Sequence, residues 1–397
     1  MRRLEVRLIS CAVIFGVAAL CQAVGAEANE GVEVSIPVAR AFTIESKVLA
    51  EERQVLVNLP RGYEDGEDRY PVLIVLDGSP FMAIFAQLSQ LDRDIPAFII
   101  AAVPNVDRLR DLSHRNVAGI WPTSGGGDAF LEFLTDELVP WIDAEFRTTG
   151  YRVITGNSAA GRYSTFALLK APETFDAAIA RSPTVGTDYE MIESLVEKSR
   201  AADIQGEHFL FVVYGSHDYP VVTTYAERLV RLLDNRAPSW LRFEREVIDN
   251  TGHFQFASIN AGLHALFEGN SFPTERFLIE GPDAVAEHAR LLSARFKTEI
   301  EASDLTGERE LIDSANDLGR QGRFTDAVAI LEYGLELRPE SATTVYYMAQ
   351  WLEHAGRTEE ALAAYDRVFE MEPSSGIAGM TTMLRENLVA REKMTAP

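Results

Sequence analysis

One serine stands between two segments of opposite character. Residues 152–155 are largely apolar and β-branched, residues 156–161 (GNSAAG) are small or polar, and a helical pattern runs over 159–169. A strand, a tight turn and a helix in that order present a serine hydroxyl above a sheet edge, and small neighbours let the backbone pass. Ser158 is therefore a candidate nucleophile.

A serine attacks an acyl group when a histidine accepts its proton and a carboxylate orients that histidine. Asp218 follows the apolar segment 209–214, and His253 follows the next strand-like segment, 241–248. The order nucleophile, acid, histidine is the one found in α/β-hydrolases. His217 is adjacent to Asp218 and is a second polar candidate in that loop.

The negative oxygen formed by such an attack needs backbone N–H donors. The amide of Ala159, directly after the candidate nucleophile, is expected to be one donor. The second is expected after the first central strand, where Asp77-Gly78-Ser79 follows the apolar segment 70–76. The amide of Gly78 or of Ser79 is the candidate there.

Other patterns do not indicate a cofactor or a metal. The glycines at 125–127 precede a helical segment, but the spacing of nucleotide-binding loops is absent, so we interpret them as a flexible entry turn. No His-x-x-x-His pair or carboxylate cluster indicates a metal. Both cysteines, Cys11 and Cys21, lie in the first 26 residues. The rest of the chain therefore has no thiol for catalysis, metal binding or disulfides.

Alternating segments from residue 33 to about 270 must position these residues. Strand-like and helix-like stretches interleave there, and Pro140 is expected to restart a helix within 130–142. This alternation predicts an α/β fold with a mostly parallel sheet and helices on both faces. The expected strands are 41–48, 53–59, 71–76, 97–103, 152–155, 177–180, 209–214 and 241–248, and the later helices are 159–169, 189–199, 221–233 and 254–266.

An internal repeat follows a helical connector at 284–302. Five positions recur at an offset of 34 residues, which is the period of tetratricopeptide repeats, with glycine or alanine at helix crossings and proline after the second helix. Two repeats bury little surface, so we expect them to pack on the connector, a C-terminal helix near 380–391 or the preceding domain. The recurring positions are Ala315, Leu318, Gly322, Ala327 and Pro339, which return as Ala349, Leu352, Gly356, Ala361 and Pro373.

The first 26 residues have the pattern of a secretory signal. Basic residues precede the apolar stretch 8–20, and Val24-Gly25-Ala26 is a small-residue cleavage site. We expect a periplasmic or secreted protein without a membrane span after cleavage, because the stretch is shorter than the ~20 residues that cross a bilayer. The expected division is a signal peptide at 1–26, a hydrolase domain at 27–272, a connector at 273–305 and two repeats with a C-terminal helix at 306–397.

The charge balance argues against nucleic acid as a partner. The chain has 37 basic and 60 acidic residues and a formal net charge of -23. Such a field repels phosphate backbones and anionic lipid surfaces. A small ester is the expected ligand, and the repeats are a possible docking surface for a protein partner.

Together these segments resemble the putative esterase family of α/β-hydrolases, which includes siderophore esterases, S-formylglutathione hydrolases, feruloyl esterases and mycolyltransferases. The resemblance spans about residues 40 to 270. It implies Ser158 as nucleophile, His253 as base and Asp218 as acid. Asn157 and Ala160 replace histidine and glycine of the family turn, and Thr184-Val185-Gly186 replaces tryptophans of the siderophore-type members. The matching stretches are 70–78 (YPVLIVLDG), 108–112 (RLRDL), 126–131 (GGDAFL), 137–140 (ELVP), the serine turn and Ser182-Pro183.

The sequence therefore predicts a serine esterase that acts through an acyl-enzyme. Two alternatives remain at this point: an acyltransferase that uses the same residues, and a non-catalytic repeat protein built on a vestigial hydrolase scaffold. A complete set of nucleophile, acid and base argues against the scaffold, since mere binding does not need all three.

Overall fold

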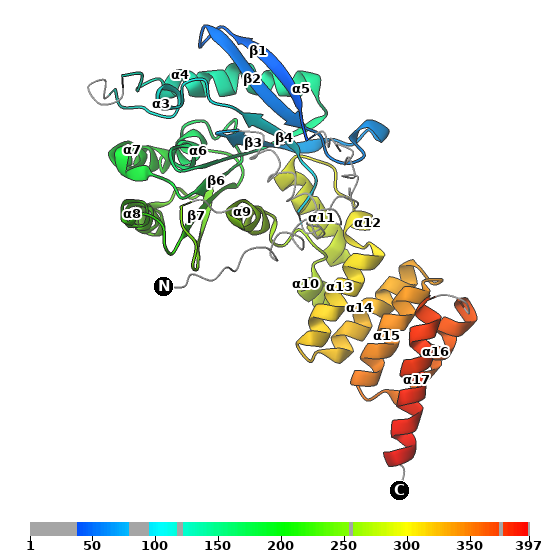
Figure 1. The fold of residues 1–397 in the computed structure, drawn as a ribbon. Helices are drawn as coiled ribbons and strands as arrows, with labels where there is room; N and C mark the ends of the chain where they lie inside the picture. Colours follow the sequence, from blue (N-terminus) through cyan, green and yellow to red (C-terminus); the bar gives the residue numbers. More distant parts are fainter. Residues whose placement is uncertain (1–37, 79–94, 117–121, 254–256, 373–375, 396–397) are drawn as a thin grey trace, which may run out of the picture. The chain divides into compact units, whose positions relative to one another are not determined.

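The computed structural model describes residues 38–78, 95–116, 122–253, 257–372 and 376–395. Within them, eight strands form one sheet in the order β1-β2-β4-β3-β5-β6-β7-β8, shown in Figure 1. The predicted signal peptide lies outside the described residues. The strands are β1 (Arg40–Ser46), β2 (Glu51–Asn58), β3 (Tyr70–Leu76), β4 (Ile99–Val103), β5 (Thr148–Asn157), β6 (Ala177–Arg181), β7 (His208–Gly215) and β8 (Leu241–Ile248).

The sheet is antiparallel at one edge and parallel elsewhere. The β1–β2 and β2–β4 pairs run antiparallel, and the pairs from β4 through β3, β5, β6 and β7 to β8 are parallel. The central strands β3, β4, β6 and β7 are nearly continuous apolar runs because helices cover both of their faces. The predicted α/β fold with a mostly parallel sheet is therefore confirmed.

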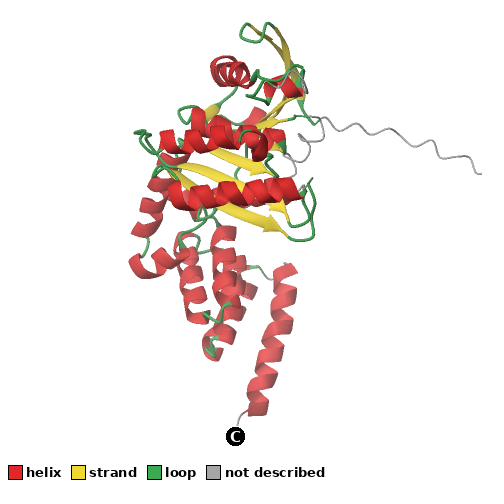
Figure 2. Ribbon diagram, turned by 90° about the vertical axis from the view of Figure 1, so that its left-hand side faces the viewer, coloured by secondary structure: helices red, strands yellow, loops and turns green. Residues whose placement is uncertain are grey.

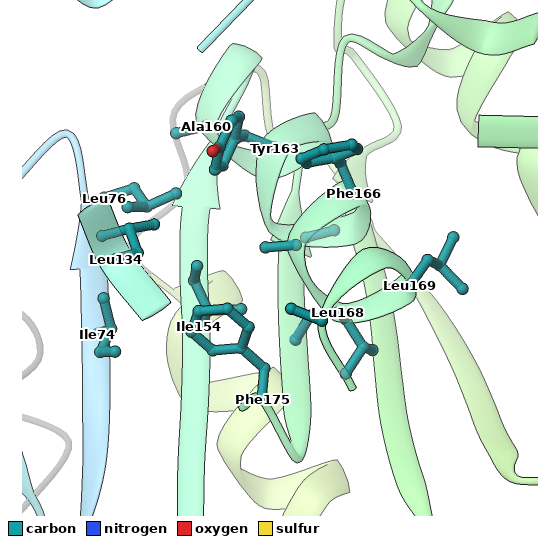
Figure 3. Close-up of a cluster of buried hydrophobic side chains, with 14 of the residues drawn as sticks. Ile74, Leu76, Leu134, Ile154, Ala160, Tyr163, Phe166, Leu168, Leu169 and Phe175 are labelled. Carbon is teal, nitrogen blue, oxygen red and sulfur yellow. The ribbon is translucent and has the colours of Figure 1, made fainter. Parts of the chain in front are cut away.

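One face of the sheet packs on helices that include the one directly after Ser158. Ile74 and Ile154 point from neighbouring strands toward this layer, beside Leu134 and the Tyr163 ring (Figure 3). Pro140 stands in the first turn of α5, as expected for a restarted helix. The helices whose side chains build this layer are α4 (Gly127–Glu132), the π-helical turn η2 (Phe133–Leu138), α5 (Val139–Glu145), α6 (Ala159–Lys170), α7 (Tyr189–Ser199) and α8 (Pro220–Arg236).

The opposite face packs on α9 (Ala257–Phe267) and α11 (Asp283–Phe296), so helices flank the strands on both sides (Figure 2). Gly262 lets α9 approach β6 closely, because an added Cβ would lie 2.4 Å from the Ile179 side chain. The ring of Phe296 packs 5.0 Å from Tyr151 of β5 and 5.1 Å from Phe267 of α9.

The C-terminal region consists of antiparallel helix pairs with the predicted 34-residue spacing. Ala315, Ala327, Ala349 and Ala361 are all fully buried. Gly322 and Gly356 have φ of 80° and 74°, a turn conformation that favours glycine and explains their recurrence. The remaining elements are η1 (Tyr63–Asp65), α3 (Arg108–Asp111), η3 (Val185–Thr187), α10 (Thr274–Glu280), α12 (Ala302–Leu305), α13 (Glu308–Arg320), α14 (Phe324–Leu337), α15 (Ala342–His354), α16 (Thr358–Met371) and α17 (Gly376–Thr395).

The first repeat packs on the hydrolase part of the chain, and the second packs mainly on its own neighbours. Leu311, Ile330 and Leu331 belong to the same apolar cluster as the second face of the sheet. Tyr333 of α14 stacks against Phe277 of α10 at 4.6 Å. Residues of α15, α16 and α17 form a separate cluster around Tyr365.

Candidate active site

Ser158 occupies a strained turn between β5 and α6. Its φ and ψ are 63° and -118°, a backbone conformation that a residue with a Cβ rarely adopts. Its N–H donates to the carbonyl of Arg181 at 2.9 Å, and its carbonyl accepts from the N–H groups of Arg162 and Thr184. These bonds, which tie the turn to the end of β6 and to α6, hold the half-buried Ser158 in that conformation.

Two glycines make this turn possible. A Cβ on Gly156 would lie 2.4 Å from the Cβ of Ala160, and one on Gly161 would lie 2.5 Å from the carbonyl oxygen of Arg181. Both contacts are too close for any side chain. The small residues around Ser158 are therefore required by packing at the strand–helix junction.

Asp218 and His253 form a buried hydrogen-bonded pair. The His253 Nδ1 lies 2.8 Å from the Asp218 Oδ1, and the two side chains are 11% and 0% exposed. An ionised carboxylate only accepts hydrogen bonds, so Nδ1 carries the proton, and in the neutral ring Nε2 is the basic nitrogen. The Tyr219 N–H also donates to Oδ1, at 2.7 Å, and fixes the carboxylate.

The three residues lie at the same edge of the sheet. Ser158 follows β5, and the loops with Asp218 and His253 follow β7 and β8. The His217 N–H donates to the Thr251 carbonyl at 2.9 Å and joins those two loops. Only β6 separates β5 from β7, a spacing of about 10 Å at the usual distance between strands. Ser158 and Asp218 therefore lie two strands apart along this edge, and His253 follows the next strand, β8.

His217, the second candidate in this loop, has a different role. Its side chain is exposed, and its backbone joins the two loops. The imidazole that meets Asp218 is that of His253.

The candidate oxyanion donors differ in their availability. The Ala159 amide is at the first position of α6, where helical N–H groups have no partner within the helix, and no described residue accepts from it. The Gly78 amide donates to the Val103 carbonyl at 2.9 Å. It is therefore not the free donor that the sequence suggested, because β4 lies against this turn. Ser79 lies outside the described residues.

The charged residues at 108–111 tie α3 to β2 and to the end of β3. Arg108 binds Asp77 through two hydrogen bonds, of 2.9 and 2.7 Å, and joins the end of β3 to α3. Arg110 hydrogen-bonds Glu51 of β2 and holds the pKa of that carboxyl at about 2. The fully buried Asp111 pairs with Arg53 at 2.6 Å. These contacts stabilise the framework beneath the candidate site.

The glycines at 125–127 also have a packing role. They lead into α4, as expected of an entry turn. A Cβ on Gly127 would lie 2.6 Å from the His114 ring, and one on Gly126 would lie 2.6 Å from the Arg110 side chain. The sequence suggested flexibility, but the structure requires small residues for close contact.

Two buried polar residues near Ser158 were not among the candidate site residues of the sequence analysis. Arg181 ends β6 and Asn157 ends β5, and each has side-chain nitrogen atoms without a hydrogen-bond partner in the structure. Burial lowers the pKa of Arg181 to about 10. An arginine at the end of a core strand, directly before Ser182-Pro183, is the signal that could have marked it.

Neither a metal centre nor a membrane span is found in the part of the chain that the structure describes. No group of three or more histidine, cysteine or acidic side chains gathers there as metal ligands. None of the described helices is both long and apolar enough to cross a bilayer.

Two parts of the chain match known family models. Residues 46–228 match the family model described as putative esterase, and residues 320–382 match a tetratricopeptide repeat model. The chain is 26% identical over 169 residues to the siderophore triacetylfusarinine C esterase of Aspergillus fumigatus. It is 33% identical over 66 residues to the ferri-bacillibactin esterase BesA of Bacillus subtilis. The matches cover 38% and 16% of this chain and span 58% and 23% of the length of those two relatives.

Solved structures share the fold. An IroE-like serine hydrolase from Shewanella oneidensis superposes with a TM-score of 0.59 and 22% identity, over 75% of this chain and 99% of that one. An uncharacterised protein from Capnocytophaga ochracea reaches a TM-score of 0.56 with 16% identity, over 89% of this chain and 99% of that one.

Proposed function

We propose that this chain, whose residues 46–228 match the putative esterase family, is a serine esterase that cleaves a carboxylic ester through an acyl-enzyme. The observation that carries the proposal is the hydrogen-bonded pair of Asp218 and His253 at the same sheet edge as a serine in a strained strand–helix turn. The names of the two siderophore esterase relatives support ester cleavage as the class of reaction.

The proposed reaction begins at the Ser158 hydroxyl. Its oxygen attacks the ester carbonyl while Nε2 of His253 takes the proton, and Asp218 stabilises the imidazolium that forms. The amide of Ala159 donates to the negative oxygen of the tetrahedral intermediate. The intermediate collapses as His253 gives the proton to the departing alcohol, which leaves an acyl-enzyme. Water then attacks the acyl group while His253 takes its proton, and the acid departs as that proton returns to the Ser158 oxygen.

The remaining parts of the proposal concern place and partners. The signal pattern of residues 1–26 supports a periplasmic or secreted enzyme. The tetratricopeptide match over 320–382 supports a protein partner for the repeats. Neither segment supplies a group for the ester chemistry, because Ser158, Asp218 and His253 lie between the two.

A fluorophosphonate probe tests the nucleophile directly, because it labels activated serines covalently. Wild-type protein should be labelled and should hydrolyse p-nitrophenyl acetate. The Ser158→Ala variant should lose labelling and at least ~10³-fold of kcat, as expected for removal of a triad member. The readouts are gel fluorescence and nitrophenolate release.

Ser271 offers a matched control. It stands in Gly269-Asn270-Ser271, which repeats the first three letters of the Ser158 turn but lies between α9 and α10. Ser271→Ala should keep full labelling and turnover. Retained labelling in Ser158→Ala would show that another residue is the nucleophile. A folded wild type that is not labelled would favour the alternative of a non-catalytic repeat protein.

A further inference from the structure

Arg181 is a buried cation that forms no ion pair with any of the described residues. The residue is 3% exposed, and its Nε and Nη2 atoms form no hydrogen bond. No carboxylate of the described residues lies within ion-pair distance of it. Although burial lowers its pKa to about 10, the guanidinium remains charged at neutral pH.

Such a charge is costly unless something neutralises it, because desolvation of an unpaired ion is unfavourable. The chain neutralises its other deeply buried arginines: Arg53 pairs with Asp111 at 2.6 Å, and Arg162 pairs with Asp188 at 3.1 Å. Asp77 raises the pKa of Arg181 only by a longer-range electrostatic interaction, because the Asp77 oxygens bind Arg108 and Asn105. Among the described residues, therefore, no carboxylate pairs directly with Arg181.

The backbone of Arg181 lies next to the proposed nucleophile. Arg181 pairs in register with Asn157, and its carbonyl binds the N–H of Ser158 at 2.9 Å. Side chains alternate along a strand, so Arg181 shares the sheet face of Ile179, where α9 packs. The loop that carries His253 leads into α9 on that face. A molecule held between Ser158 and His253 would be close to Arg181.

We propose that Arg181, with the side-chain amide of Asn157, binds a carboxylate carried by the ester substrate. This inference rests on the proposed esterase function and specifies its substrate class as an ester with a free acid group near the scissile carbonyl. Nε and Nη2 lie on one edge of the guanidinium, and two parallel N–H groups match the two oxygens of a carboxylate. The buried Nδ2 of Asn157, which is also unpartnered, supplies a further donor.

Two esters of equal chain length test this assignment: monoethyl succinate, which carries a carboxylate, and ethyl butyrate, which does not. Ethanol release gives kcat and KM for both. The wild type should prefer monoethyl succinate. In Arg181→Met the ratio of kcat/KM for the acidic over the neutral ester should fall at least ~10-fold, chiefly through KM. Arg181→Lys keeps the positive charge but cannot form a bidentate hydrogen bond, so it should retain part of the preference for the acidic ester.

Arg152→Met is a matched control, because Arg152 also lies in the sheet but pairs with Asp143 near the start of β5. That variant should keep the wild-type ratio. An unchanged ratio in Arg181→Met, with ethyl butyrate still hydrolysed, would overturn the carboxylate site and leave the esterase proposal standing. A wild type that hydrolyses neither ester and resists the fluorophosphonate probe would instead overturn the esterase proposal.

Folding of Arg181→Met is checked by circular dichroism and by fluorophosphonate labelling. If that variant does not fold, inhibition of the wild type decides the question. Succinate should inhibit ethyl butyrate hydrolysis competitively, and the neutral succinamide should inhibit it at least ~10-fold more weakly. Equal inhibition by the two compounds would overturn the proposal.

Discussion

Buried polar groups near the serine turn differ in how they are satisfied. The carboxylate of Asp218 accepts two hydrogen bonds on one oxygen, and Arg162 is paired, whereas Arg181 has unpartnered nitrogens. The structural pairs fix loops and helices. The carbonyl of Arg181 binds the Ser158 N–H, while the Arg181 Nε and Nη2 atoms have no hydrogen-bond partner among the described residues.

His114 is a second residue whose environment opposes its charged form. Its ring stacks on Tyr163 and contacts Phe166, and neither nitrogen has a hydrogen-bond partner among the described residues. Burial is the main cause that lowers the His114 pKa. Asp128, 4.0 Å from Nδ1, is 81% exposed and offsets this little, because water screens it.

This burial predicts a pH-dependent stability. The unfolded chain binds a proton at His114 below a pH of about 6.5, whereas the folded chain binds it only at lower pH. Stability from the neutral ring is therefore present above that pH and is lost as the pH falls. In urea unfolding at pH 7 and pH 5, His114→Phe should lose less stability on acidification than the wild type. Equal losses would show that His114 is not the group responsible.

At the scale of elements, the junction of β5 and α6 determines where Ser158 stands. The helix begins directly after the serine, and the end of β6 lies against its first turn. Gly161 is where the two backbones approach most closely, since its missing Cβ leaves room for the Arg181 carbonyl. The same carbonyl binds the Ser158 N–H, so a shift there would move the nucleophile.

Gly161→Ala should therefore impair both folding and activity. An alanine in a helix normally gains about 1 kcal/mol over glycine, but here the Cβ meets a backbone atom that cannot rotate away. We expect a lower melting temperature and a loss of p-nitrophenyl acetate turnover of about 10-fold or more. Gly379→Ala is the matched helical control, because nothing lies within 4 Å of its Cβ in α17. A Gly161→Ala variant as stable and active as Gly379→Ala would contradict this account.

At the scale of the whole molecule, one apolar cluster joins the sheet to the first repeat. Phe211 of β7, Val285 of α11 and Leu311 of α13 all belong to it. The second repeat and α17 use a different cluster, centred on Tyr365. The first repeat therefore shares a hydrophobic core with the sheet, and the buried residues of the second repeat do not belong to that core.

Two truncated proteins test this boundary. A chain that ends at Arg338 retains α13 and α14 and should keep its esterase activity within ~3-fold. A chain that ends at Ile300 removes Leu311, Ile330 and Leu331 from the shared cluster, and each buried leucine or isoleucine is worth about 1.5–3 kcal/mol. It should melt at a markedly lower temperature or aggregate. The measurements are thermal unfolding and specific activity of the soluble monomer, and equal melting temperatures would refute a shared core.

The sequence by itself was sufficient for features that short stretches of chain encode. The position of Ser158 followed from an apolar strand, small turn residues and a helical pattern, because these preferences act within about ten residues. The mostly parallel sheet followed from uninterrupted apolar runs that alternate with helices. The repeats followed from their period, since glycine with positive φ and buried alanine recur wherever the same helix pair recurs.

Tertiary structure alone decided which distant groups meet. The sequence named His253 as base and Asp218 as acid, but it could not show that the two side chains meet, because this depends on how the loops after β7 and β8 face each other. Nor could it show that the Val103 carbonyl accepts the hydrogen bond of the Gly78 amide, or that no described carboxylate pairs with Arg181. Each of these facts depends on strands that are adjacent in the sheet but far apart in the chain. The periodicity of a sequence indicates on which face of a strand a side chain lies, but not which residues of other strands lie next to it.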